Sequence, residues 1–177
     1  MMPVLNNPKH EKFAQELSKE IARIRELFSY DGEAGHLVRL VSQGKVKKGK
    51  IAGCLRSDGY LSVRFDKKGY LAHRLIWALV YGEWPVEIDH INGNRADNRL
   101  QNLRLATKSQ NQANKGIQKN NTSGFKGVTR TRFGKWRVQI QWKAKLMHFG
   151  HHSSKEEAAA VYCKAAKELF GEYARVR

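Results

Sequence analysis

Cysteine is scarce in this chain of 177 residues, which has only Cys54 and Cys163. Two cysteines without a CxxC pair exclude a disulfide scaffold and give no zinc-finger pattern, so we expect no zinc site. Each is expected to be a small buried apolar residue in a reducing compartment. Long apolar runs are also lacking, which excludes a membrane span. The first six residues lack the basic-then-apolar layout of a signal peptide, and this favours a cytoplasmic protein.

Acidic residues are in short supply as well. The chain carries 16 Asp and Glu against 33 Lys and Arg, for a formal net charge of +17. This excess is larger than solubility requires, and it favours a polyanionic partner. Nucleic acid is the main expectation, and a membrane surface is the weaker alternative. Because 41% of the residues are apolar, the chain can bury a core, and wholesale disorder is not expected.

The positive charge gathers in two segments. Residues 31–75 hold ten Lys and Arg against four acids, and residues 116–177 hold thirteen against four. Residues 1–30 and 76–115 each hold five against four, so they are nearly neutral. This distribution is what two binding surfaces on either side of a chemical centre would produce.

The N-terminal half predicts one long helix, a small sheet and a short helix. Apolar residues recur at three- and four-residue steps over 8–28, from Phe13 to Phe28, with Asn7-Pro8 as cap and first turn. Short alternating runs at 36–41, 60–65 and 70–72 predict an antiparallel sheet, with turns at Asp58-Gly59 and Lys68-Gly69. Residues 74–81 predict a short helix that ends before Gly82.

A lysine-rich loop interrupts this sheet. Lys45, Lys47, Lys48 and Lys50 stand within six residues. They are either a solvated charge run or phosphate contacts, and the two interpretations are about equally supported.

The near-neutral centre predicts a hairpin laid against a helix. Residues 86–91 form a short strand, Asn92-Gly93 a turn, and 103–106 a second strand. Thr107 can then cap a helix that carries Asn111 and Asn114. This arrangement is one way to bring Asp89, His90 and Asn111 near a common point.

These side chains can cleave a phosphodiester. A histidine of near-neutral pKa can take a proton from water. Carboxylate and amide oxygens can hold a hard cation that bridges the scissile phosphate and the leaving oxygen. For an isolated Asp-His pair, however, the alternative of simple turn and cap residues is much the more common.

The wider sequence motif favours the catalytic role over the turn-and-cap role, because it resembles a known family. Several spaced segments carry a resemblance: Asp-His-Ile-Asn-Gly-Asn, Asp-Asn-Arg-Leu-Gln-Asn-Leu-Arg and Asn-Gln-Ala-Asn, with His73-Arg74-Leu75 and Tyr81–Pro85 upstream. Together they resemble the HNH (His-Me finger) endonucleases of mobile phage elements over roughly residues 30–115. The resemblance implies that His90 is the general base and that Asp89 and Asn111 hold one Mg²⁺ or Mn²⁺. It also implies that Asn102 braces the loop holding His90. We expect His73 to be a packed or phosphate-touching residue rather than a second base.

The last third predicts a compact unit of strands and one helix. Residues 136–143 alternate strictly, so Trp136, Val138, Ile140 and Trp142 share one face that can pack on a helix over 153–170. A capping box of Ser154 and Glu157 begins that helix, and Gly171 ends it. The opposite strand face is either ordinary solvated surface or, because it lacks acids, a DNA-reading surface.

This region also resembles a known domain. Ser123–Val128, Gly134-Lys135-Trp136, Phe149-Gly150 and Glu157–Ala166 are similar to an AP2 DNA-binding domain, over about 123–176. The resemblance implies a three-stranded sheet in the major groove. Lys126, Thr129 and Thr131 stand where the plant members carry Arg, which supports DNA binding more than base reading. The expected DNA contacts of the whole chain are Lys45, Lys47, Lys48, Lys50, Arg74, Lys126, Thr129, Arg130, Thr131, Arg132, Lys135, Arg137, Gln139, Gln141 and Lys143.

We therefore expect an α+β fold in three parts. They are a helix (1–30), an HNH nuclease domain with its N-terminal sheet (31–115, ββα-metal core about 84–115), and an AP2-like domain (123–177) after a linker (116–122). The expected function is a homing-type DNA endonuclease, monomeric on double-stranded DNA, in the bacterial host cytoplasm if it is phage-encoded. The alternative is a non-catalytic DNA-binding regulator. RNA binding is disfavoured because the C-terminal aromatics are committed to a core.

Overall fold

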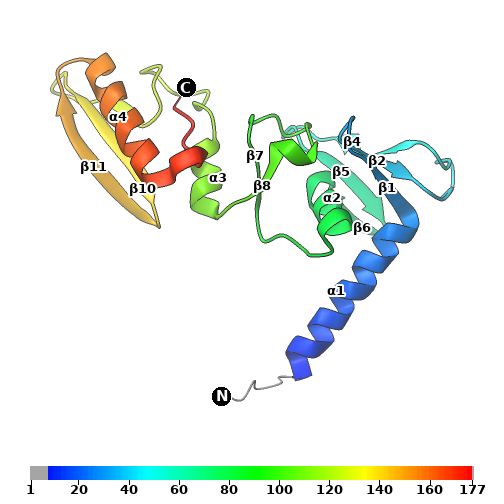
Figure 1. Cartoon of the computed structure of the whole chain (residues 1–177). Coiled ribbons are helices and arrows are strands. Elements are labelled where there is room, and N and C mark those ends of the chain that lie inside the picture. Colours follow the sequence, from blue (N-terminus) through cyan, green and yellow to red (C-terminus); the bar gives the residue numbers. More distant parts are fainter. Residues whose placement is uncertain (1–7, 177) are drawn as a thin grey trace. The chain divides into compact units, whose positions relative to one another are not determined.

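Two compact units make up the part of the chain described by the computed structural model, residues 8–176 (Figure 1). They divide between Arg104 and Leu105. This division lies ahead of the linker predicted at 116–122, because the helix that carries Asn111 packs with the C-terminal elements. The predicted cap Asn7 lies outside the described residues.

The first unit begins with a long helix and continues into small antiparallel sheets. Strands β1 (Phe28–Asp31), β2 (His36–Arg39) and β3 (Ile51–Ala52) form one sheet, and β4 (Cys54–Leu55), β5 (Leu61–Phe65) and β6 (Lys68–Leu71) form another. Strands β7 (Ile88–His90) and β8 (Leu103–Leu105) pair with each other, and η1 (Leu100–Asn102) leads into β8. The helices are α1 (Pro8–Leu27) and α2 (Ala72–Tyr81).

Both predicted helices of this unit are confirmed. Helix α1 buries Ile21, Ile24 and Leu27, as its periodicity predicts, whereas the side chain of Phe13 lies outside the described set. Helix α2 begins two residues earlier than predicted and ends at Gly82, whose φ of 73° is the left-handed conformation that glycine adopts at little cost. The buried face of α2 packs against α1, β1, β5 and β6, and it forms the centre of the first core.

One predicted turn is wrong. The β5–β6 hairpin turns at Asp66 and Lys67, with φ of 45° and 66°, while Lys68 and Gly69 belong to β6. Positive φ at both central positions is the pattern of a type I′ hairpin turn, and aspartate tolerates that conformation. The predicted turn at Asp58-Gly59 is confirmed, with Gly59 N–H donating to the carbonyl of Arg56.

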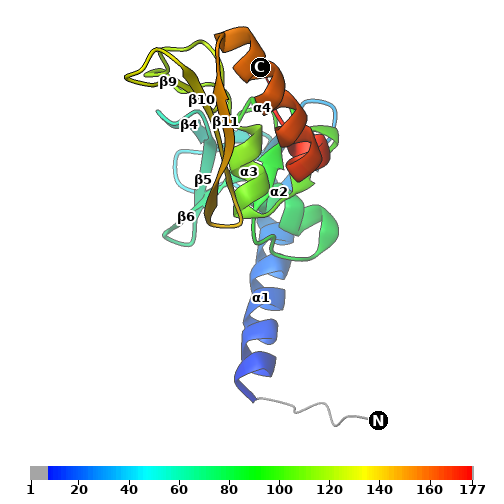
Figure 2. The same ribbon diagram turned by 90° about the vertical axis from the view of Figure 1, so that its left-hand side faces the viewer.

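The second unit is a three-stranded sheet covered on one face by a helix (Figures 1 and 2). Strand β10 (Trp136–Trp142) lies between β9 (Val128–Arg130) and β11 (Lys145–His152), and α4 (Lys155–Phe170) packs on the sheet. Val138 and Ile140 are buried against α4, with Trp136 and Trp142 at the margins, as the alternation predicts. Helix α3 (Lys108–Asn114) and η2 (Gly171–Tyr173) complete the unit.

The helix starts of the second unit follow the sequence closely. Thr107 caps α3 in a full capping box with Gln110. Ser154 caps α4 and accepts from the N–H of Glu157, but the Glu157 carboxylate bonds Ser153 instead of closing the predicted box. Glu157 reaches Ser153 Oγ at 2.9 Å, so it satisfies a hydroxyl as well as a backbone N–H.

The predicted burial of the two cysteines can be compared with the structure. Cys54 is exposed on β4, so its predicted burial is wrong, because β4 is a two-residue edge strand with both side chains exposed. Cys163 is half-buried on α4. Among the described residues, no helix is long and apolar enough to cross a bilayer.

Candidate active site

Strand β7 carries Asp89 and His90 into the interior of the first unit. Ile88, Asp89 and His90 are all buried. The chain then turns at once: Gly93 N–H donates to the His90 carbonyl at 2.7 Å, and Gly93 has a φ of 75°. Because a turn follows directly, His90 is fixed at the end of a paired strand.

Asn102 ties together the two ends of the loop that follows His90. Its Oδ1 accepts from the N–H of Asn92 at 2.9 Å, and its Nδ2 donates to the carbonyl of Asp97 at 2.7 Å. Its own carbonyl accepts from the N–H of Ile91 at 2.9 Å. These are the contacts that the predicted bracing role requires.

An ion pair closes the same loop. Asp97 accepts from Arg99 Nη2 at 2.6 Å and from Asn92 Nδ2 at 2.8 Å. The Arg99 hydrogen bond, followed by that of Asn92, holds the pKa of Asp97 far below its usual range. The loop is therefore closed by a carboxylate that stays ionised at neutral pH.

Asp89 is paired with an arginine that the sequence analysis did not single out. Arg104 Nε and Nη2 lie 2.9 and 2.8 Å from Asp89 Oδ2, and the two side chains are only 12% and 4% exposed. A buried carboxylate requires such a partner. Arg104 thus offsets the cost of burying this carboxylate, and carboxylate oxygen is a donor type that hard cations prefer.

His90 is held by a buried asparagine. Its Nε2 lies 2.9 Å from Asn98 Oδ1, and the His90 ring is 4% exposed. Burial lowers the pKa of His90, while the Asn98 hydrogen bond and the charge of Asp89 act in the opposite direction. At neutral pH the imidazole is therefore uncharged, as a general base must be.

Two rings lie against His90. His73 meets it edge to face with centroids 4.9 Å apart, and Tyr60 lies 5.9 Å away. The Arg95 guanidinium covers Tyr60 at 4.9 Å and donates to the Asp58 carbonyl. Burial, and then electrostatic interactions with His90 and Arg74, lower the pKa of His73 to about 3. These contacts favour a packed role for His73 over that of a second base.

Asn111 lies in the middle of α3, in the second unit, where it is half-buried. Its role as a metal ligand remains a prediction. Carboxylate and amide oxygens suit a hard cation, so the predicted pair Asp89 and Asn111 fits Mg²⁺ in donor chemistry. Among the described residues, no cluster of three or more His, Cys, Asp and Glu side chains could hold a metal ion, and an amide ligand is outside that class.

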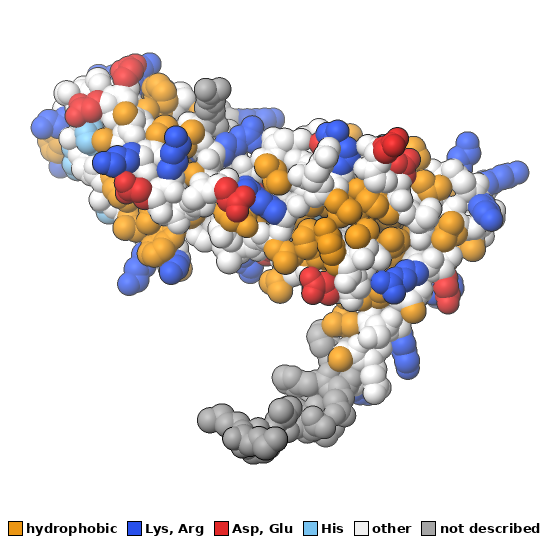
Figure 3. Space-filling view, in the orientation of Figure 1, with side chains coloured by type: hydrophobic (Ala, Val, Ile, Leu, Met, Phe, Trp, Pro, Cys, Tyr) orange, Lys and Arg blue, Asp and Glu red, His pale blue; other side chains and the backbone are white. Residues whose placement is uncertain are grey.

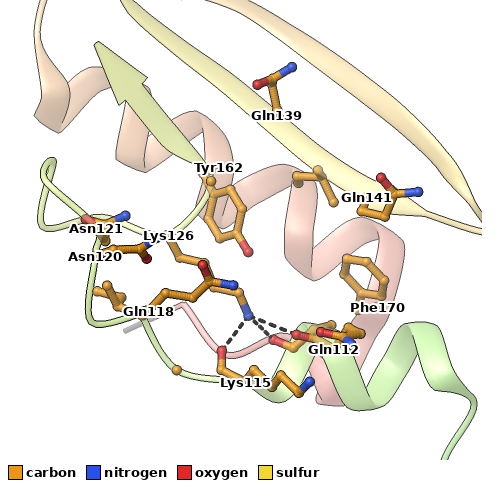
Figure 4. A pocket seen from close by; sticks show the side chains of 15 residues that line it. Gln112, Lys115, Gln118, Asn120, Asn121, Lys126, Gln139, Gln141, Tyr162 and Phe170 are labelled. Atoms are coloured by element: carbon orange, nitrogen blue, oxygen red, sulfur yellow. Dashed lines mark hydrogen bonds between the residues drawn. The ribbon is translucent and has the colours of Figure 1, made fainter.

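Two of the predicted DNA contacts are committed elsewhere. Arg74 donates to the carbonyls of Pro85 and Val86 at 2.8 and 3.2 Å, so it holds the segment before β7. Lys126 donates to three carbonyls at the end of α3, those of Gln112, Ala113 and Lys115, beside a cavity of about 310 Å³ (Figure 4). Burial, and then nearby cations, lower the pKa of Lys126 to about 8.

The strand register of the second sheet shows on which face each of the remaining predicted DNA contacts lies. Arg137 lies opposite Thr129 and His151, and Gln139 lies opposite His148, so these side chains share the face turned away from α4. Gln141 follows on the same face. Arg130 pairs with Trp136 on the other face, and the Thr131 hydroxyl is buried.

The turns hold the other cations. Lys143 is wrongly placed on β10 by the sequence analysis: it lies in the β10–β11 turn with a φ of 45°, its ammonium 4.3 Å from the Trp142 ring. Arg132 and Lys135 are exposed in the β9–β10 hairpin, and the lysines of the 45–50 loop are exposed in the first unit. Lys and Arg side chains stand out over the visible face of each unit (Figure 3).

Comparison with known proteins identifies a family over this part of the chain. The HNH endonuclease family profile matches residues 70–113, which include Asp89, His90 and Asn111. Protein 3.8 of Escherichia phage T7 is 35% identical over 108 residues, covering 59% of this chain and 88% of that protein. The chain belongs to the HNH endonuclease family. It is thus a nuclease, and its substrate is a nucleic acid.

A second viral relative supports this membership. An uncharacterized HNH endonuclease of Acanthamoeba polyphaga mimivirus is 34% identical to this HNH protein over 123 residues, covering 68% of the chain. The chain spans 63% of the length of that relative. No solved structure gives a significant match.

The sequence analysis of this HNH protein missed the partners of its central residues. Asn98 and Arg104 both lie in the segment Asp-Asn-Arg-Leu-Gln-Asn-Leu-Arg, which carries part of the resemblance to HNH endonucleases. A usable signal was present, since a buried Asp and a buried His each need a polar partner. The segment offers several candidates, however, and only the path of the loop selects among them.

Proposed function

We propose that this HNH protein is a metal-dependent DNA endonuclease of the homing type that hydrolyses phosphodiester bonds. The observation that carries the proposal is His90, buried and uncharged beside the Asp89–Arg104 pair and held by Asn98. A neutral imidazole fixed at the end of a strand can take a proton from an attacking water. His90 is the general base in this proposal.

Asp89 and Asn111 would hold one divalent cation, Mg²⁺ or Mn²⁺. When bound, that ion supplies positive charge to the scissile phosphate and the leaving oxygen. Asn102 keeps the loop after His90 closed, and the Asp97–Arg99 pair reinforces it. The expected products are 5′-phosphate and 3′-hydroxyl ends.

Double-stranded DNA is the proposed substrate, contacted by basic surfaces on each unit. In the second unit these are the face of Arg137, Gln139 and Gln141 and the hairpin of Arg132 and Lys135. A three-stranded sheet covered by one helix is the arrangement that an AP2-like domain would use to enter a major groove. No acidic residue occurs between positions 98 and 155, which supports contact with a polyanion.

The first test is cleavage of plasmid DNA with Mg²⁺, with Mn²⁺ and with chelator. We expect His90→Ala to bind DNA as the wild type does and to cut about 10²–10⁴-fold more slowly, since general-base catalysis contributes about that much. A His90→Ala protein that cuts at the wild-type rate would remove the assignment. Binding without cutting by the wild type under every divalent cation would favour the non-catalytic regulator.

The metal role of Asn111 has its own test. Asn111→Ala should weaken binding of Mn²⁺, measured by calorimetry on the whole protein, and should abolish cutting at low metal concentration. Gln112→Ala removes an exposed amide from the next position of α3 and should change neither property. Equal metal affinity in the two variants would mean that the second ligand is another residue.

A further inference from the structure

Asn98 is one of the most deeply buried side chains of the described residues, and beyond holding the His90 ring it has no stated part in the proposed mechanism. It is 1% exposed, and its Oδ1 lies 2.9 Å from His90 Nε2. A carboxamide oxygen can only accept a hydrogen bond. The contact therefore places the proton of neutral His90 on Nε2 and leaves the lone pair of the ring on Nδ1.

The amide nitrogen of Asn98 has no partner. Its Nδ2 is buried without a hydrogen bond among the described residues. An unpaired buried donor lowers stability, and it persists in a native fold where another requirement outweighs that loss. The requirement visible here is the oxygen that faces His90.

The backbone of Asn98 is clamped from the N-terminal sheet. The hydroxyl of Tyr30, on β1, donates to the Asn98 carbonyl at 3.2 Å and accepts from the N–H of Leu100 at 3.1 Å. Gly35, with a φ of 72°, packs against the same segment, where a Cβ would lie 2.7 Å from the Arg99 nitrogen. The β1–β2 hairpin thus holds the backbone of the segment that carries the Asn98 side chain.

We propose that Asn98 is a positioning residue that sets the tautomer of His90, and that Tyr30 holds Asn98 in place for this purpose. The inference rests on the proposed role of His90 as the base. With the proton confined to Nε2, the base nitrogen is Nδ1 in every molecule. Without the Asn98 oxygen the two tautomers compete, and only one of them offers Nδ1 as a base.

The decisive readout is the tautomer itself. The ¹⁵N resonances of labelled histidine distinguish a protonated from an unprotonated ring nitrogen, and His90→Gln identifies the His90 signals. We expect metal-free wild-type protein at about pH 8, above the ordinary histidine pKa, to show protonated Nε2. Asn98→Leu, which keeps the size and removes the oxygen, should shift the ring toward protonated Nδ1. Asn98→Asp, which keeps an acceptor, should restore the wild-type pattern.

Cleavage kinetics give the second readout. Asn98→Leu leaves the Nε2–H of the active tautomer buried without an acceptor, which disfavours that tautomer, so kcat should fall by about 10–100-fold with KM and DNA affinity unchanged. Asn98→Asp should recover most of the rate. Gln101→Leu removes an exposed amide from the same segment and should alter neither the tautomer nor kcat.

The outcomes separate this inference from the proposed function. A wild-type tautomer in Asn98→Leu overturns the inference, whatever the cleavage rate. If Asn98→Leu does not fold, Tyr30→Phe removes only the clamping hydroxyl and should produce a smaller shift in the same direction; no shift there overturns the inference. If the wild type cuts no DNA under any divalent cation, the proposed function fails, while the tautomer measurement still decides the role of Asn98.

Discussion

His73 and His90 meet edge to face inside the first unit, where burial disfavours a positive charge on either ring. His73 Nδ1 is buried with no hydrogen-bond partner in the described part of the chain, so a proton there would gain nothing from the protein. Burial therefore lowers the pKa of His73 to about 3, which means that protonating this ring in the folded protein costs free energy. The unfolded chain, in contrast, offers an ordinary histidine with a pKa near 6.5.

This difference predicts a loss of stability in acid. Between pH 6.5 and 3 the unfolded state binds a proton that the folded state rejects, so stability is complete near pH 7 and falls as the pH falls through that window. His73 alone should account for about 2 kcal/mol between pH 7 and 5. Urea unfolding at the two pH values should show this loss in the wild type and a smaller one in His73→Phe.

Replacing a histidine outside the core provides the control. His151→Asn changes an exposed histidine on β11, so it should leave the wild-type pH dependence intact. If His73→Phe loses as much stability as the wild type between pH 7 and 5, His73 is not the group responsible.

At the same scale, the sequence predicts which residues matter better than it predicts what they touch. Asp89, His90 and Asn102 were named from their motif, and their burial and contacts suit the predicted roles. Arg104 and Asn98 were not named, although they hold Asp89 and His90. These pairs are 15 and 8 positions apart, across a loop with no periodic pattern. No propensity gives the path of such a loop.

At the level of elements, long periodic segments were predictable and short strands were not. Helices α1 and α4 and strand β10 follow from their apolar spacing. Strands β3 and β4 are two residues long, too short for alternation to be visible. The hairpin turns at Asp66-Lys67 and Lys143-Ala144 use left-handed residues other than glycine, so a search for glycine misplaces them.

One glycine is required for the packing of the second unit. Gly127 has a φ of 67°, and a Cβ at this position would lie 2.3 Å from the Tyr162 ring and 2.7 Å from the Gln139 carbonyl. Gly127→Ala should therefore lower the free energy of unfolding by about 3 kcal/mol or more, because the collision adds to the backbone strain. Thermal or urea unfolding measures the loss.

Gly124→Ala is the matched control. Gly124 has a similar φ of 78°, but nothing lies within 4 Å of its added Cβ. At Gly124 only the strain of the left-handed backbone should lower the free energy of unfolding, by about 1–2 kcal/mol. Equal losses in the two variants would show that strain, and not contact with Tyr162, sets the requirement at Gly127.

For the whole molecule, the division at Arg104 and Leu105 changes how DNA binding should be tested. Helix α3 carries Asn111, and its last carbonyls are bonded by Lys126 and by the N–H of Arg175. Deleting residues 116–177 would strip α3 of these contacts and disturb nuclease and binding surface together. Point substitutions of charge leave the fold of each unit intact and are therefore the cleaner test.

The salt dependence of DNA binding then reports which cations touch phosphates. Each lost phosphate contact should reduce the slope of log K against log salt by about 0.9. Arg132→Gln with Lys135→Gln, in the exposed β9–β10 hairpin, should therefore lower the slope by about 2. Lys47→Gln with Lys48→Gln tests whether the 45–50 loop makes contacts of its own. Fluorescence anisotropy without divalent cation, at several salt concentrations, provides the measurement.

A control pair removes the same charge elsewhere in the second unit. Lys164 and Lys167 are exposed on α4, the helix that covers the opposite face of the sheet. Lys164→Gln with Lys167→Gln should leave the slope unchanged, because those cations are turned away from the proposed DNA surface. A slope that falls equally in both pairs would mean that net charge attracts DNA without a defined face. A fall confined to the hairpin pair would place the DNA backbone along the β9–β10 edge.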